Sequence, residues 1–246
     1  MFISVVSHGH SALIIELGTL KNLVSEHTVI VTDNIGEKPL KEFCSTYGIH
    51  YLLNEKRKGF GENNNQNYRY AVNKLSMTDD DYFLVLNPDV IVSNVDLIDA
   101  QAEMNKVNSQ LATINLCKGQ DIFDANVRNF PKIINFIESF LYKKNKTIIN
   151  KAQVTDNCFV DWASGSFLIF KSALYKGLSG FDESFFMYCE DLDICRRAMS
   201  FYKQKVLYIA SVRAFHIAAH NNRKIFSKHF IWHVMSVFRY CFIAKY

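Results

Sequence analysis

Three acidic side chains stand within four residues of one another, after an aromatic run and just before Arg196 and Arg197. Gly180 and Asp182 upstream predict a turn, and a helix is expected to begin near Cys189. The acids would then occupy the first helical turn, where the helix dipole favours negative charge. They are Glu190, Asp191 and Asp193.

Stabilisation of a helix start explains all three acids, and for Glu190 and Asp193 the sequence does not decide between this and a functional role. Asp193 and Arg197 are spaced to form an i,i+4 pair on the helix surface. Asp191 differs, because it has no obvious partner and its helical neighbours are mostly apolar. We therefore predict that Asp191 faces a pocket, where its carboxylate accepts the proton of a hydroxyl group.

The elements that position these acids begin with four short apolar strands, which alternate with amphipathic helices over the first ~110 residues. This alternation predicts parallel strands joined by right-handed crossovers, and therefore an α/β fold. An apolar stripe from Leu13 to Val24 predicts one helix after the first strand. The expected strands are residues 2–7, 28–32, 49–53 and 82–86.

Polar side chains follow each of these strands. In open parallel sheets, ligands bind beyond the carboxyl ends of the strands, so these side chains are expected to converge on one crevice. They are Ser7, His8, Asp33, Asn34, Asn54, Asn87 and Asp89.

Asn87-Pro88-Asp89 offers one carboxylate and one amide oxygen, which suit Mg²⁺ or Mn²⁺. A plain turn explains the same residues, but their place at a strand end favours a metal site. Asp79-Asp80-Asp81 also contains two acids one residue apart. It precedes the fourth strand and is expected at the opposite edge of the sheet, as a solvated turn.

Five other polar or glycine positions allow two explanations each. His216 and His220 are candidates to bind a metal or a diphosphate, although a histidine near a strand end is more often structural and imidazole suits transition metals better than Mg²⁺. Asp33 can accept hydrogen bonds from a nucleobase or cap the turn after it. Gly59 and Gly61 fail as a dinucleotide fingerprint, since they follow the third strand, but their loop can approach a ligand.

The composition is that of an ordinary folded protein, with 49% apolar and 21% charged residues in a chain of 246. This length fits one large α/β domain or two merged halves. Six cysteines without C-x-x-C spacing predict reduced thiols in a cytosolic protein. No signal peptide is recognisable, and no run reaches ~18 apolar residues, so no membrane span is expected.

The charge is unevenly distributed. The last 53 residues, from Ile194 to Tyr246, contain no Asp or Glu and ten of the 28 Lys and Arg residues, which leaves 18 basic and 24 acidic side chains before them. Apolar residues at 226, 230, 234, 237 and 241 repeat with helical period, which fits a helix packed on the core or one at a membrane interface. The basic flank favours an anionic membrane surface. No motif predicts nucleic-acid binding.

Together these segments resemble the family 2 glycosyltransferases of the GT-A fold, over nearly the whole chain. Within that family the sequence is most similar to bacterial rhamnosyltransferases of O-antigen assembly, which transfer L-rhamnose from dTDP-L-rhamnose to N-acetylglucosamine on a polyprenyl diphosphate. The motifs that carry the resemblance are Val5–Gly9, Asp33-Asn34, Gly59–Asn65, Leu86–Asp89, Asp161–Ser166, Gly180–Asp182 and Phe186–Cys195.

The resemblance implies a Rossmann-like parallel-sheet half merged with a mixed acceptor-binding half, followed by a basic amphipathic helix. On this basis residues 1–115 bind the nucleotide sugar and residues 116–155 form a variable connection. The sequence from Phe123 to Lys151, which includes the basic cluster at 143–146, predicts a solvated connection. Residues 156–220 form the acceptor-binding and catalytic half. Residues 221–246 form a helix at the membrane, on the cytoplasmic face of the bacterial inner membrane.

The resemblance also implies roles for individual residues. Asp191 would be the catalytic base of an inverting transfer, and Asp89 with His216 would hold Mg²⁺ or Mn²⁺. Asn87 stands where Asp is commoner, which leaves one negative charge fewer. Trp162 would offer a stacking surface to a sugar. The expected donor contacts are Ser7, His8, Asp33, Asn34, Gly59, Gly61, Asn87 and Asp89, and the acceptor or sugar pocket is expected to contain Asp161, Trp162, Gly165 and Glu190.

Other functions fit parts of the sequence. A nucleotidyltransferase that makes nucleotide sugars shares a Rossmann-like half, but it usually has a Gly-rich phosphate loop directly after the first strand, and Ser7–His10 is not one. A family 2 enzyme could use a different nucleotide sugar. A non-catalytic module that binds nucleotide sugars at the membrane would keep the fold without transfer.

Overall fold

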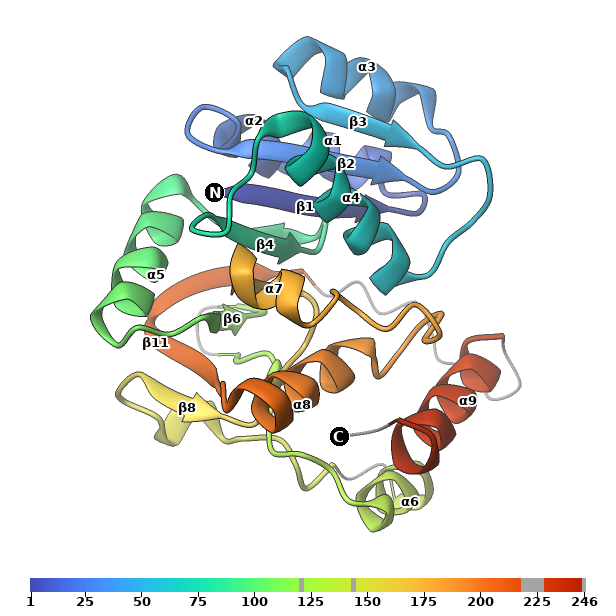
Figure 1. The fold of residues 1–246 in the computed structure, drawn as a ribbon, viewed down its shortest axis with the longest axis vertical. Helices are drawn as coiled ribbons and strands as arrows, with labels where there is room; N and C mark the ends of the chain where they lie inside the picture. The colour runs from blue at the N-terminus through green and yellow to red at the C-terminus, as the bar shows by residue number, and fades with distance from the viewer. Residues whose placement is uncertain (120–121, 143–144, 218–227, 245–246) are drawn as a thin grey trace.

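A nine-stranded mixed sheet runs through the whole molecule (Figure 1). The computed structural model describes residues 1–119, 122–142, 145–217 and 228–244. The strands of this sheet are β1 (Phe2–Ser7), β2 (Thr28–Asp33), β3 (His50–Leu53), β4 (Tyr82–Leu86), β5 (Val90–Ile91), β6 (Leu111–Cys117), β8 (Cys158–Val160), β10 (Phe167–Lys171) and β11 (Val206–His216). A separate pair consists of β7 (Val127–Arg128) and β9 (Trp162–Ala163).

The strand order β3-β2-β1-β4-β10-β6-β11-β5 joins the two halves of the chain in one sheet, with β8 pairing to β11. The first four strands are parallel, as the sequence predicts. β10 is antiparallel to both β4 and β6, so the second half is mixed. Because β6 extends to Cys117, the division at residue 115 falls inside a strand of the common sheet.

Helices cover both faces of the sheet. α1 (Ser11–Leu17), α2 (Thr19–Leu23), α3 (Lys38–Tyr47) and α5 (Asn94–Lys106) pack on one face, and α4 (Phe60–Leu75), α7 (Ser172–Gly177) and α8 (Glu190–Tyr202) on the other. Strand side chains alternate between the two cores: Leu84 faces the first and Phe83 the second. α6 (Ile133–Tyr142) and α9 (Lys228–Phe242) lie side by side (Figure 1), and a short 3₁₀ helix spans Lys151–Gln153.

Two local predictions meet different outcomes. The single helix expected from Leu13 to Val24 is wrong, because Gly18 adopts a left-handed backbone with φ of +63° and separates α1 from α2. The solvated turn expected at residues 79–81 is confirmed. Asp79 is exposed and pairs with Lys176 at 3.0 Å, on the edge of the sheet where β4 begins.

The polar face of α4 is buried against the sheet. Asn64 accepts a hydrogen bond from Ser4 at 2.6 Å, and Asn67 accepts one from Thr32. Ser4 and Thr32 are polar residues within the buried strands β1 and β2, so the asparagines satisfy groups that would otherwise be unpaired in the core. The asparagine-rich part of the Gly59–Asn65 motif is therefore largely structural.

Asn65 ties α4 to the chain that leads into α8. Its side-chain oxygen accepts hydrogen bonds from the Tyr175 hydroxyl at 2.7 Å and the Phe181 N–H at 2.9 Å. Its amide nitrogen donates to the Phe181 carbonyl at 2.9 Å and to Glu183 at 3.0 Å. One buried amide thus fixes three segments of the fold.

We predict that Asn65→Ala lowers the free energy of unfolding by about 3 kcal/mol, because buried partners of the lost amide are left without hydrogen bonds. Urea unfolding monitored by circular dichroism measures this change. Asn73→Ala is the matched control, since Asn73 lies on the exposed side of the same helix. Equal stability of the two variants would show that the Asn65 contacts contribute nothing.

Candidate functional site

A short turn at residues 164–166 holds Asp191 and the end of β4 on the same edge of the sheet. The N–H of Gly165 donates to Asp191 Oδ2 at 3.0 Å. The carbonyl of the next residue, Ser166, accepts the N–H of Asn87 at 2.9 Å. The carboxylate predicted to accept a proton and the Asn87–Asp89 turn predicted to hold a metal are therefore joined through adjacent residues of one turn.

The start of α8 is made by an unusual backbone. Tyr188 and Cys189 both have left-handed conformations, with φ of +72° and +63°. Such conformations cost roughly 1–3 kcal/mol each in residues other than glycine, so surrounding contacts must hold them. The helix begins at Glu190, as the sequence predicts near Cys189.

Two glycines make room for the loop that precedes α8. A Cβ on Gly59 would clash with the carbonyl oxygen of Phe186, which accepts the N–H of Phe60 at 3.1 Å. A Cβ on Gly61 would lie 2.7 Å from Cβ of Phe181. Close packing explains both glycines, and a contact between their loop and a donor stays a prediction.

The same loop is held on its other side by α9. The rings of Phe186 and Trp232 have centroids 4.8 Å apart, and Ser236 Oγ donates to the Met187 carbonyl at 2.8 Å. Arg239 of α9 lies 3.5 Å from Asp182. One face of α9 therefore packs on the segment that leads to the acidic residues.

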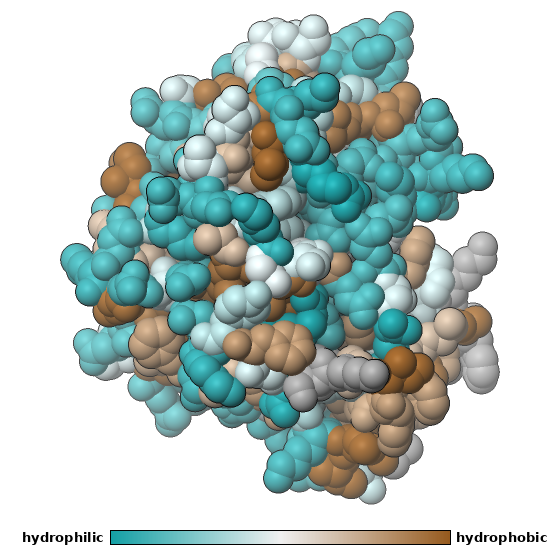
Figure 2. Space-filling view, in the orientation of Figure 1, coloured by the Kyte–Doolittle hydropathy of each residue, from teal (hydrophilic) through white to brown (hydrophobic). Residues whose placement is uncertain are grey.

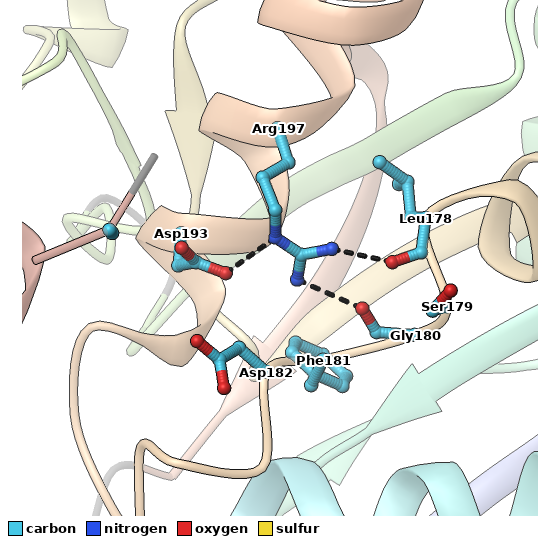
Figure 3. Close-up of a pocket in the computed structure, with 8 residues that line it drawn as sticks. Leu178, Ser179, Gly180, Phe181, Asp182, Asp193 and Arg197 are labelled. Atoms are coloured by element: carbon cyan, nitrogen blue, oxygen red, sulfur yellow. Dashed lines mark hydrogen bonds and ion pairs between the residues drawn. The ribbon is translucent and has the colours of Figure 1, made fainter. Parts of the chain in front are cut away.

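Arg197 braces α8 against the Gly180 turn (Figure 3). It donates to Asp193 at 2.7 Å, and to the carbonyls of Leu178 at 2.6 Å and Gly180 at 2.9 Å. The predicted pair of Asp193 and Arg197 is confirmed, but Asp193 is buried rather than on the surface. A cavity of about 250 Å³ lies beside these contacts, and Asp193 and Arg197, which line it, stabilise the fold through their pairing.

The two remaining acids lie in different environments. Burial raises the pKa of the Asp191 carboxyl, although hydrogen bonds from the N–H groups of Gly165 and Leu192 oppose that rise. Burial and the nearby Asp191 raise the pKa of Glu190 well above its usual range, and one oxygen of Glu190 has no hydrogen-bond partner. Adjacent carboxyl groups with such shifts are typical of acid–base sites.

Strand pairing brings His216 to Asp89. β11 is antiparallel to β5, with His216 opposite Val90, and the N–H of Ile217 donates to the Asp89 carbonyl at 3.0 Å. His216 Nε2 then lies 3.3 Å from Asp89 Oδ1, while Nδ1 lies 2.6 Å from Asp124 Oδ2. Burial disfavours the charged ring, but the two carboxylates together raise the pKa of His216 to about 9.

These residues fit a divalent cation that the substrate helps to bind. Asp89 Oδ1 is buried without a well-aligned hydrogen bond, and an imidazole nitrogen faces it. Within the described residues, no group of three or more His, Cys, Asp or Glu side chains converges as a complete metal cage. One carboxylate and one imidazole suit Mn²⁺ and leave positions for phosphate oxygens. His220 lies outside the described residues.

Comparison with known proteins decides the family, although no protein-family model matches the chain. The rhamnosyltransferase WbbL of Escherichia coli K12 is 38% identical over 244 residues, which cover 98% of this chain and 92% of that protein. The chain belongs to the family 2 glycosyltransferases, with the GT-A fold. A hexosyltransferase of low-salt glycan biosynthesis, Agl10 of Haloferax volcanii, is 26% identical over 184 residues, 73% of this glycosyltransferase and 57% of Agl10.

Solved structures share the fold. The mannosyltransferase PcManGT of Pyrobaculum calidifontis, in complex with GDP-Man and Mn²⁺, aligns over 100% of this glycosyltransferase with a TM-score of 0.62 at 12% identity. Staphylococcus aureus TarS 1–349 aligns over 88% with a TM-score of 0.59 at 15% identity. This chain spans only 64% and 60% of those two proteins, and at such identities the likeness shows the GT-A fold alone.

The residues predicted to contact the donor of this glycosyltransferase lie at the strand ends, and Asp33 has the most internal contacts. Its carboxylate accepts the N–H groups of Ile35, Gly36 and Glu37 and the hydroxyl of Tyr51. Burial opposes ionisation, but these bonds lower the pKa of Asp33. Asp33 thus caps its turn, and a contact with a base, which would share these acceptor sites, stays a prediction.

The other strand-end residues divide into structural and accessible groups. Ser7 donates to Glu37 at 3.2 Å, and Asn34 contacts Lys58 through both ends of its amide, which anchors the loop before α4. His8 is exposed. Ser7 pairs with Asp33 across β1 and β2, so these residues share one edge, as predicted from the strand ends.

The predicted sugar pocket needs one correction. Trp162 is only 8% exposed, its N–H donates to the Asn129 carbonyl at 3.0 Å, and the guanidinium of Arg128 lies 5.2 Å from its ring centroid. The stacking surface expected on Trp162 is therefore largely covered. Asp161 accepts the Phe130 N–H at 2.8 Å. Both residues anchor the connection beside the site.

The sequence interpretation misses charged residues that the connection brings to the site. Asp124 contacts His216, Arg128 lowers the pKa of Asp191 by its charge, and Lys151 is buried. The expectation of a solvated segment is therefore wrong for this part of residues 116–155. The sequence does contain a pattern that indicates burial here, because polar and apolar residues alternate from Phe123 to Arg128 as in a half-buried strand.

We predict that Glu190→Gln removes a pH-dependent loss of stability. Because the pKa of Glu190 is raised in the folded protein, folding favours the neutral carboxyl group. This group contributes its full share to the free energy of unfolding below the pKa of the unfolded state, and that share is lost as the pH rises through the pKa of the folded state. Urea unfolding of parent and variant from pH 4 to pH 9 measures this. The parent should lose more stability with rising pH than Glu190→Gln, and the exposed Glu16→Gln should follow the parent. Parallel curves for Glu190→Gln and the parent would contradict it.

Proposed function

We propose that this glycosyltransferase moves L-rhamnose from dTDP-L-rhamnose onto a polyprenyl-diphosphate-linked acceptor sugar, N-acetylglucosamine, during assembly of O antigen. The 38% identity to the rhamnosyltransferase WbbL over nearly the full length of both proteins supports rhamnose as the transferred sugar, and the sequence motifs that resemble O-antigen rhamnosyltransferases support the donor and the pathway. The observation that carries the transfer chemistry is the turn at residues 164–166, which joins the Asp191 carboxylate to the Asn87–Asp89 strand end.

Asp191 is the proposed base of an inverting reaction. Its carboxylate takes the proton of the acceptor hydroxyl as that oxygen attacks the anomeric carbon of the donor. A raised pKa suits this role, because it makes the carboxylate a stronger proton acceptor than a solvated aspartate. The N–H of Gly165 fixes the carboxylate in place while the proton moves.

The diphosphate leaves at the opposite side of the sugar. Asp89 and His216 are the residues that would hold Mn²⁺ or Mg²⁺, and a divalent cation bound there would supply positive charge to offset the negative charge of the departing diphosphate. With Asn87 in place of an acid, the site carries one negative charge fewer, so substrate oxygens contribute more to holding the cation. The charge of Arg128 lowers the pKa of Asp191, so a cation lies close to the proposed base.

We predict that the purified protein releases dTDP from dTDP-L-rhamnose in the presence of a lipid-linked acceptor and that a chelator stops the reaction. Asp191→Asn should lower kcat by roughly 10²- to 10⁴-fold, since it removes the general base. Asp79→Asn, an exposed carboxylate on the opposite edge, should behave as the parent. Transfer is measured with a panel of nucleotide sugars and product analysis.

Three outcomes separate the alternatives. Faster transfer from another nucleotide sugar would replace rhamnose but keep the mechanism. Binding of nucleotide sugars without transfer to any acceptor would favour a non-catalytic module. Near-parental turnover of folded Asp191→Asn would exclude Asp191 as the base.

We also propose that the protein binds the cytoplasmic face of the inner membrane through α6 and α9. The two helices touch through Phe136 with Tyr240 and Phe140 with Phe230. Brown and tan side chains gather over them at the lower right of Figure 2. Apolar residues between 47% and 64% exposed line this surface: Ile133, Ile134, Ile137, Phe140, Ile231, Val234, Met235, Phe238 and Phe242.

The apolar stripe that the sequence predicts on α9 divides in the structure. Val237 and Cys241 pack against the core beside the buried Ser236 and Tyr240, whereas Val234 is exposed. Phe226 lies outside the described residues. The outer face remains apolar, and the surrounding sequence has no acids, which matches an anionic lipid surface. Within the described residues, no helix is long and apolar enough to span a membrane.

We predict that replacing Phe140 and Phe238 together by Ser weakens binding to phosphatidylglycerol-containing vesicles by tenfold or more, because two phenyl groups no longer enter the lipid at about 1.5–3 kcal/mol each. Vesicle sedimentation measures the partition. Replacing the exposed Val95 and Ile98 of α5 by Ser is the matched control. The same loss in both double variants, or in neither, would reject this surface.

A further inference from the structure

A carboxylate from the connection contacts the histidine of the candidate metal site. Asp124 Oδ2 lies 2.6 Å from His216 Nδ1, while Nε2 of the same ring faces Asp89 Oδ1 at 3.3 Å. The three side chains are only 12–17% exposed. We propose that Asp124 is the positioning residue of this site: by accepting the Nδ1 proton, it fixes the imidazole with Nε2 directed at a cation on Asp89.

The backbone places Asp124 independently of the ring. β6 runs parallel to β11, with Leu116 opposite Ala214. After β6 the chain turns back, and the N–H of Asp124 donates to the Leu116 carbonyl at 2.9 Å. Asp124 is therefore hydrogen-bonded to β6, the strand that pairs with the one carrying His216.

The second oxygen of Asp124 is occupied elsewhere. Oδ1 accepts the N–H of Ala125 at 2.8 Å, and the ammonium of Lys118 lies 3.4 Å from it. These contacts orient the carboxylate and leave Oδ2 for the ring. The arrangement has the form of a carboxylate–histidine pair behind a metal ligand.

The chemistry of imidazole gives this contact its consequence. A neutral ring has one N–H and one lone pair, and a metal binds the nitrogen that carries the lone pair. When a cation on Asp89 takes the place of the Nε2 proton, the shorter contact of Nδ1 with Asp124 keeps the remaining proton on Nδ1. The Nε2 lone pair then faces the cation, and the carboxylate also makes that nitrogen a stronger ligand.

Metal binding tests this role without any measurement of turnover. Free Mn²⁺ is titrated by electron paramagnetic resonance against the full chain with dTDP present, and pulsed measurements detect coupling of Mn²⁺ to imidazole ¹⁴N. Asp124→Asn is expected to weaken Mn²⁺ binding about 10- to 100-fold and to reduce the ¹⁴N coupling. Asp79→Asn, another lysine-paired carboxylate, is expected to match the parent. Asp124→Glu keeps a negatively charged carboxylate acceptor, whereas Asn offers only a neutral amide oxygen, so Asp124→Glu should bind Mn²⁺ more tightly than Asp124→Asn.

A second pair of variants separates positioning from general stabilisation. In a His216→Gln background, Asp124→Asn should cause no further loss of Mn²⁺ affinity, since it acts through the missing ring. An equal further loss, or parental affinity and ¹⁴N coupling in Asp124→Asn alone, would overturn the inference. If Asp124→Asn does not fold, Asp124→Ser, which also removes the carboxylate, is measured instead: weakened Mn²⁺ binding with reduced ¹⁴N coupling supports the inference, and parental values overturn it.

The inference rests on the metal site of the proposed function. Mn²⁺ binding by the unmodified parent protein is therefore measured first. Absence of Mn²⁺ binding by the parent would overturn both. If the parent binds Mn²⁺ and removal of the Asp124 carboxylate leaves that affinity unchanged, only the inference about Asp124 is overturned.

Discussion

The glycosyltransferase site depends on a backbone turn at residues 164–166 that has no space for a side chain at its centre. A Cβ on Gly165 would lie 2.8 Å from the ring of Phe60 and 3.6 Å from Cβ of Asp191. A larger residue would therefore displace the ring of Phe60, the first residue of α4, from its place against the turn that holds Asp191. Because the two sides of the site meet through backbone hydrogen bonds, their relative position is rigid, and small displacements of reacting groups are costly.

The structure distinguishes three neighbouring acids that sequence spacing leaves alike. Asp193 is paired with Arg197, whose guanidinium also binds two carbonyls, so its charge serves the fold. Glu190 is buried with an unpaired oxygen, which favours its neutral form. Asp191 alone receives the N–H of Gly165 from the turn beside β4. Burial and hydrogen bonding therefore give adjacent carboxyl groups different protonation behaviour, although their intrinsic chemistry is almost the same.

The sequence predicts features that depend on local period and fails for those that depend on distant partners. The parallel strands and the helix start at Glu190 follow from periodicity, turn residues and strand ends. The buried role of Asn65 does not, because its partners lie more than a hundred residues away. The contact of Asp124 with His216 also spans 92 residues, and only the parallel pairing of β6 with β11 brings them together. The prediction of one helix from Leu13 to Val24 failed for a local reason instead, since the left-handed backbone of Gly18 interrupts a regular apolar stripe.

The two explanations for the C-terminal helix are compatible, because a helix has two faces. The inner face of α9 holds the loop before α8 through Trp232 and Ser236. The outer face carries exposed apolar residues such as Met235 and Phe238. If that outer face enters lipid as proposed, the membrane fixes a helix that also supports the left-handed backbone at Tyr188 and Cys189. Lipid contact and the position of the catalytic acid would then be energetically linked, since ordering α9 on the membrane lowers the cost of ordering the loop that it contacts.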